Sequence, residues 1–188
     1  IMSKSQIGVK KIFYGPALSA VAVPYIDGDD ATGLSPAELK AFLAAATTKQ
    51  VENVHEDNWN YEKSLASKTW YKNKLTGQKY RGATDDPGDS IITFTMGKYN
   101  FESKAEFEGG AASANKWSAA SVFANKVMTI VALTEDDVYI VYTKADIVAG
   151  GVTTDDAIGE SVQATALEPD IQIESEAWIL KSAVDAAA

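Results

Sequence analysis

The stretch VMTIVALTEDDVYIVYT, residues 127–143, decides the fold class. Two runs of β-branched and aromatic residues flank an acidic tetrapeptide, TEDD, at 134–137. Val138, Ile140 and Tyr142 lie on one face of the second run, because successive side chains of a strand point to opposite faces. The stretch therefore predicts two antiparallel strands joined by a short acidic turn.

The same alternation recurs along the chain. In SIITFTMG (90–97), Ile92, Phe94 and Met96 share one face. Further strands are expected at VKKIFYG (9–15), SAVAVPYI (19–26), KQVENVHE (49–56), TGQKYRG (76–82), ESVQATAL (160–167) and IQIESEAWIL (171–180). About eight or nine strands at this spacing predict a mainly β chain, folded as an antiparallel β-sandwich or barrel.

Helical signals are few. In SPAELKAFLAAA (35–46), Ser35 is the expected N-cap, Pro36 the first helical residue and Glu38 the second half of a capping box. A second short helix is expected at NFESKAEFEGG (100–110), whereas the Ala- and Ser-rich segment 111–126 fits either a helix or an ordered loop. One or two α-helices are thus expected to flank the sheet.

Bulk composition narrows the class of protein. The chain has 188 residues, no cysteine and a formal net charge of -9. This length suits one domain, 1–188, and the lack of cysteine excludes disulfides and thiolate metal sites. No 18-residue apolar run and no secretory signal are evident, so a soluble, cytosolic protein without membrane contact is expected. The excess of carboxylates argues against a sequence-blind nucleic-acid binder.

Catalytic and metal-binding signals are weak. His55 is the only histidine, and its neighbours Glu56 and Asp57 do not form an oriented triad with it, so a structural role is expected. The acidic loop DGDDATG (27–33) has Ala and Thr where a calcium loop needs an oxygen ligand and a glycine, which favours a solvent-facing turn. We predict no enzyme, no cofactor and no metal, with an enzyme using His55 and Glu56 or Asp57 kept as an alternative.

One segment carries charge of the opposite sign. Residues 61–81 hold six cations against the single carboxylate of Glu62, a net +5, so the other residues total -14. Aromatic residues lie between the cations, which fits either stacking on single-stranded nucleic acid or an interaction arm that grips an acidic surface. The overall acidity favours an arm, assigned to residues 57–81. Its candidate interface residues are Trp59, Tyr61, Lys63, Lys68, Trp70, Tyr71, Lys72, Lys74, Lys79 and Arg81.

The order of these segments resembles the major tail tube proteins of tailed bacteriophages, particularly Bacteroides-type phages and prophages. The resemblance covers most of residues 6–170. Its segments are IGVKKIFYG, ELKAFLAAA leading into VENVHEDNWNYE, YKNKLTGQKYR, SIITFTMGKYNFESKAEFEGG, IVYTKADIVAG and VQATALEPD.

The resemblance implies a structural role. Such proteins form hexameric rings that stack into a hollow tube, and arms between their strands contact the next ring. The implied partners are further copies of the chain, other tail proteins, and DNA that passes through an acidic lumen without specific binding. The implied location is the virion tail, assembled in the cytoplasm of the host bacterium. The alternative is a β-barrel or sandwich module that binds a small ligand or glycan on Trp59, Tyr61 and Trp70.

Overall fold

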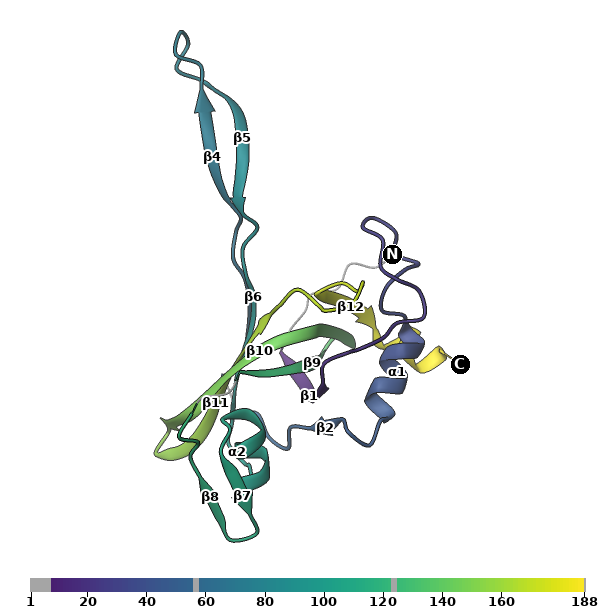
Figure 1. Ribbon diagram of the computed structural model, residues 1–188, viewed down its shortest axis with the longest axis vertical. Helices are drawn as coiled ribbons and strands as arrows, with labels where there is room; N and C mark the ends of the chain where they lie inside the picture. Colours follow the sequence, from purple (N-terminus) through teal and green to yellow (C-terminus); the bar gives the residue numbers. More distant parts are fainter. Residues whose placement is uncertain (1–7, 56–57, 123–124, 188) are drawn as a thin grey trace.

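The chain is mainly β, as predicted, and its computed structural model describes residues 8–55, 58–122 and 125–187. An eight-stranded sheet with antiparallel pairing forms the body (Figure 1). Its strands are β1 (Val9–Pro16), β2 (Lys49–Gln50), β3 (Asn60–Lys63), β6 (Ser90–Met96), β9 (Lys126–Thr134), β10 (Val138–Thr154), β11 (Ala157–Ala166) and β12 (Glu176–Leu180). Two separate hairpins, β4 (Ser67–Lys72) with β5 (Lys79–Asp86) and β7 (Ala111–Ser113) with β8 (Lys116–Ser118), extend from it.

The long strand β10 shapes the body. β9 pairs with it on one side, while β12 and then β11 pair with successive halves of its other side. The register with β9 shifts between Tyr142 and Ala145, and such an irregularity bends a strand. The sheet therefore curls into a sandwich-like body rather than a closed barrel. β3 and β12 approach each other through side chains, with the rings of Tyr61 and Trp178 at 5.4 Å.

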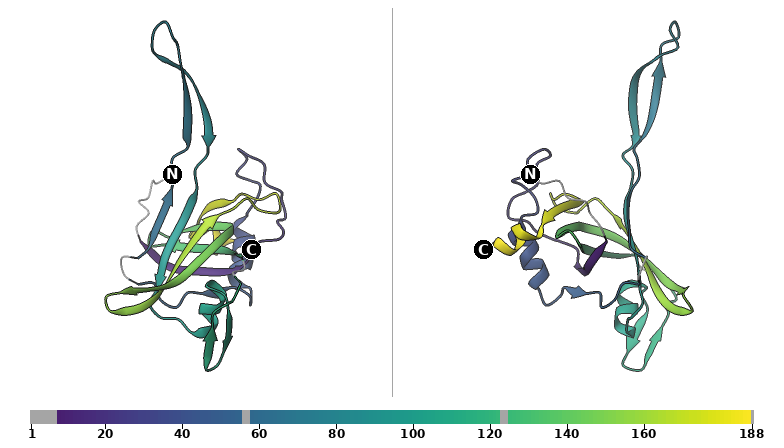
Figure 2. Two further views of the ribbon diagram at one scale, coloured as in Figure 1. Left: turned by 60° about the vertical axis from the view of Figure 1, so that its left-hand side comes forward. Right: turned by 180° about the vertical axis from the view of Figure 1, so that it is seen from behind.

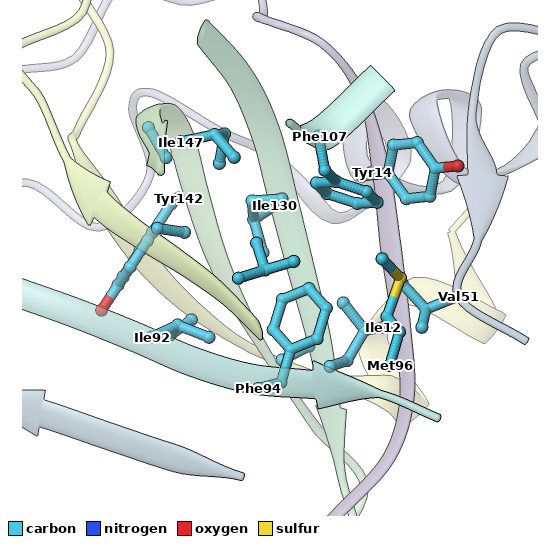
Figure 3. Close-up of a cluster of buried hydrophobic side chains, with 14 of the residues drawn as sticks. Ile12, Tyr14, Val51, Ile92, Phe94, Met96, Phe107, Ile130, Tyr142 and Ile147 are labelled. Carbon is cyan, nitrogen blue, oxygen red and sulfur yellow. The ribbon is translucent and has the colours of Figure 1, made fainter. Parts of the chain in front are cut away.

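The main core lies on the inner side of this curl (Figure 3). Ile92, Phe94 and Met96 of β6 are all buried, which confirms the face predicted for that strand. Phe107, from helix α2 (Phe101–Phe107), closes the core with its ring 4.6 Å from that of Tyr14. Each fully buried side chain of this size contributes roughly 2–3 kcal/mol through removal of apolar surface from water.

The opposite face of the sheet carries a second core under helix α1 (Pro36–Ala44) and helix α3 (Lys181–Ala186). Leu39 and Phe42 of α1 are buried there. The predicted capping box is present, since the amide of Glu38 donates to the hydroxyl of Ser35 and the Glu38 carboxylate accepts from the Ser35 amide. Three short helices therefore pack on the sheet in the described ranges, whereas one or two were predicted.

Five expectations about individual segments were wrong or incomplete. In 171–180 only Glu176–Leu180 is a strand, and in 76–82 the strand begins at Lys79. Residues 19–26 form no strand, because Pro24 cannot donate to a ladder and the segment holds only isolated backbone bonds, such as the Tyr25 amide to the Gln172 carbonyl. In 49–56 only Lys49–Gln50 is a strand, and residue 56 lies outside the described residues. The described part of 111–126 contains the β7–β8 hairpin and not a helix.

In the described ranges, no helix is long and apolar enough to cross a bilayer.

Candidate subunit interface on a projecting hairpin

Residues 64–89, called the arm below, leave the body between two neighbouring strands. Lys63 at the end of β3 pairs with Ser90 at the start of β6, and the next pair is joined by the Ser64 amide and the Asp89 carbonyl at 2.9 Å. The hairpin β4–β5 then continues away from the body (Figures 1 and 2). At about 3.3 Å per residue, the path from 64 to the tip at 75 spans roughly 35 Å.

The tip is a turn built by local hydrogen bonds. The Asn73 amide donates to the Gln78 carbonyl, and the Gly77 amide donates back to the Asn73 carbonyl at 2.7 Å. The Asn73 side chain accepts from the amide of Leu75, and Gly77 has a φ of 70°, a value that favours glycine. The sequence of the tip therefore fixes the point at which the chain reverses.

One face of the arm is organised around Trp70. Its cross-strand partner is Gly82, and a Cβ at position 82 would lie 2.8 Å from the Trp70 ring. The ring thus lies across the bare backbone of β5. The ammonium groups of Lys79 and Lys68 lie 4.5 Å and 5.9 Å from the ring centroid, at cation–π distance.

The other face carries a second set of pairs. The guanidinium of Arg81 lies 5.8 Å from the centroid of Tyr71, which is its cross-strand partner. Nearer the body, the Thr69 hydroxyl donates to the Asp85 carboxylate at 2.7 Å. Both faces are therefore ordered by pairs within the arm.

The outer arm is purely cationic. Residues 68–84 contain Lys68, Lys72, Lys74, Lys79 and Arg81 and no carboxylate. None of these cations has a carboxylate within 4.0 Å in the part of the chain that the structure describes. Their charges are thus available to an acidic partner.

Large apolar side chains accompany these charges. Leu75 at the tip is 95% exposed, and Trp70, Tyr71 and Tyr80 are also exposed. β4 and β5 pair with each other and with no other described strand. Because an isolated two-stranded hairpin is marginally stable in water, such an arm gains stability when another surface covers it. Aromatic residues are enriched in protein interfaces, so the exposed rings of the arm favour an interface there.

The root of the arm is fixed by Glu176 on β12. Its carboxylate accepts hydrogen bonds from Tyr61 Oη at 2.6 Å, Ser90 Oγ at 2.7 Å and Trp178 Nε1 at 2.7 Å, and Lys63 Nζ lies 3.4 Å away. Burial acts to raise the pKa of Glu176, but these donors outweigh it and lower the pKa. Both strands that lead into the arm are thereby tied to β12.

The predicted interface residues fall into two groups. Lys68, Trp70, Tyr71, Lys72, Lys74, Lys79 and Arg81 lie on the arm, whereas Trp59, Tyr61 and Lys63 lie on the body at its root. The arm was predicted at 57–81, whereas in the structure it begins at 64 and ends at 89. Residue 57 lies outside the described residues. Sequence reasoning missed Glu176, since nothing in IQIESEAWIL marks that carboxylate as buried.

The other candidate sites give no assembled chemistry. The His55 ring lies 3.7 Å from Asp155, whose side chain is 86% exposed, so this pair lies at the surface. Glu56 and Asp57 lie outside the described residues. The Thr32 hydroxyl closes the acidic loop 27–33 by donating hydrogen bonds to the backbone carbonyls of Ile26 and Asp29. No group of three metal-binding side chains occurs in the described ranges.

The three aromatics of the proposed ligand platform do not share a surface. Trp59 and Tyr61 pack against the main core and, with Trp178, line a hollow of about 270 Å³. Trp70 lies on the arm. The arrangement therefore lacks the continuous stacking face that the ligand-binding alternative requires.

No known protein family model matches the chain, and no curated protein matches it either.

Proposed function

We propose that this chain is a structural subunit of a phage tail tube, whose copies assemble through the arm into stacked hexameric rings. The arm carries this proposal: it is an ordered hairpin that exposes cations and aromatics away from its own body. The ordered resemblance of 6–170 to tail tube proteins supports the same assignment.

The charge distribution favours contacts between unlike surfaces. The segment 68–84 carries +5, so the remaining residues carry -14. Two identical arms repel each other, whereas an arm and the body of another copy attract. Such heterologous contacts propagate, and they generate rings when the rotation closes or open stacks when it does not.

The acidity of the body also suits a conduit for DNA. Duplex DNA carries one negative charge per ~1.7 Å, so a cationic wall would hold it in place. A tube built of subunits with a net charge of -9 repels DNA over most of its surface and leaves it free to move. In this proposal DNA passes through without specific binding.

Charge reversal in the arm tests the proposal. Concentrated wild-type protein should form rings or tubes by electron microscopy and sediment as large species. The variant K72E/K74E/K79E should remain monomeric with an unchanged circular dichroism spectrum, because exposed reversals seldom cost much stability. The matched control K11E/K98E/K116E makes the same change in net charge at exposed lysines outside the arm and should assemble.

Two results would count against the proposal. One is wild-type protein that stays monomeric at every concentration reached. The other is the arm variant building tubes as readily as its matched control.

A further inference from the structure

The body carries an acid-lined surface beside the loop that follows β1. Two adjoining hollows of about 620 Å³ and 450 Å³ share Tyr25, Glu174 and Glu176. One is also lined by Asp29 and Asp30 and the other by Glu168. This surface is called the acidic groove below.

The groove is strongly anionic. The segments 23–34 and 166–180 that form it contain seven carboxylates and no Lys or Arg: Asp27, Asp29, Asp30, Glu168, Asp170, Glu174 and Glu176. Lys63 and Lys144 pair with Glu176 and Asp170. The other five have no cation within 4.0 Å in the described ranges, which leaves a local charge of -5.

The groove is preformed. The Leu34 amide donates to both Glu174 oxygens, and the Tyr25 amide donates to the Gln172 carbonyl at 2.9 Å. A Cβ at Gly33 would lie 2.0 Å from the Glu174 carboxylate, so the close approach of these segments depends on that glycine. The segments of the groove are therefore already held in place before a partner binds.

Apolar side chains lie among these charges. Trp178, which lines the larger hollow, is 45% exposed, and Ile26 and Leu180 of the same two segments are 60% and 51% exposed. The groove thus combines exposed apolar residues with carboxylates, and the arm combines exposed aromatics with cations. Interfaces of this kind join desolvated apolar contacts with charges of opposite sign.

We infer that the acidic groove of one copy receives the arm of a second copy. The charges are complementary, since the groove carries -5 and the outer arm, residues 68–84, carries +5. Asp85, Asp86 and Asp89 at the base of the arm lower the net charge of residues 64–89 to +2. The arm of the same chain leads away from the body, and β4 and β5 pair with no other described strand, so the arm does not fill its own groove (Figure 2). This inference rests on the proposed assembly through the arm and adds the surface that accepts it.

A charge-swap experiment tests the match. The groove variant D27K/D30K/E168K reverses three exposed carboxylates and leaves Glu174 and Glu176 in place. It should raise the concentration for half-maximal assembly at least tenfold, as should the arm variant K72E/K74E/K79E. An equimolar mixture should assemble at close to the wild-type concentration, because each arm then meets a groove of opposite sign on the other variant.

The control variant E52K/E102K/D185K changes the net charge by the same amount at exposed carboxylates outside the groove. It should assemble as the wild type does. Circular dichroism and thermal melting of each variant separate loss of assembly from loss of fold.

The outcomes distinguish the groove from the assembly itself. If the arm variant fails to assemble while the groove variant assembles normally, the acceptor is another surface and this inference is overturned. The same holds if the folded variants do not assemble when mixed. If wild-type protein never assembles, the proposed function fails first.

Discussion

At the scale of single residues, Glu176 has the largest consequence for the arm. One carboxylate receives donors from β3, β6 and its own strand β12, so it joins the two strands that enter and leave the arm. Its side chain is only 10% exposed. A buried carboxylate that satisfies several donors is costly to remove, because each donor then loses its partner.

We expect Glu176→Gln to destabilise the monomer by about 1–2 kcal/mol at pH 7. Since the pKa of Glu176 is lowered in the folded state, its stabilising contribution is present above the ordinary value of 4.5 and is lost as the pH falls through the lower folded value. The difference in unfolding free energy between wild type and variant should therefore shrink on acidification. Denaturant titrations at pH 7 and below pH 4 measure it.

Glu168→Gln provides the control, because that side chain is exposed. It should change stability by less than about 0.5 kcal/mol. A constant difference between wild type and Glu176→Gln at both pH values would show that the ionised carboxylate is not the stabilising form.

At the scale of elements, sequence patterns correctly predicted those strands, turns and helix caps that depend on residues close together in the sequence. The hairpin at 127–143, the capping box at Ser35 and the short helix within 100–110 were all confirmed. At the β10–β11 turn, Asp155 and Asp156 both adopt positive φ, as a tight hairpin turn requires. The prediction of a strand at 19–26 was wrong because no described strand pairs with this segment. The alternation of apolar residues in a sequence does not show whether a neighbouring strand is present.

The arm extends from the body as a hairpin of its own, so the body should fold without it. We expect replacement of residues 65–88 by Asn-Gly, which joins Ser64 and Asp89 in a tight turn, to leave the unfolding free energy of the monomer within about 1 kcal/mol of wild type. The reason is that β4 and β5 pair only with each other among the described strands. Guanidinium titration of both proteins, under conditions that keep the wild type monomeric, makes the comparison.

The same shortened protein should form no rings or tubes. A loss of 3 kcal/mol or more would instead mean that the arm belongs to the folding unit of the body.

At the scale of the whole molecule, the curl of the sheet and the position of the arm depend on long-range contacts. β10 changes partner from β12 to β11 along its length, and no short window of sequence encodes this change. The positive charge of the arm could be predicted because it is the sum over residues that follow one another in the sequence. Seven of the ten predicted interface residues lie on the arm. The acidic groove could not be predicted from the sequence, because it is formed by segments about 140 residues apart. The hydrogen bond between Leu34 and Glu174 joins these segments.

The central claim is that each arm engages a different copy of the chain. Because the protein has no cysteine, Leu75→Cys places a single thiol at the exposed tip, where a photoreactive maleimide can be attached. Irradiation of assembled protein should yield cross-links between chains, with the partner peptide drawn from 23–34 or 166–180. Cross-links confined to the arm's own chain, or none under conditions in which the labelled protein assembles, would contradict the claim.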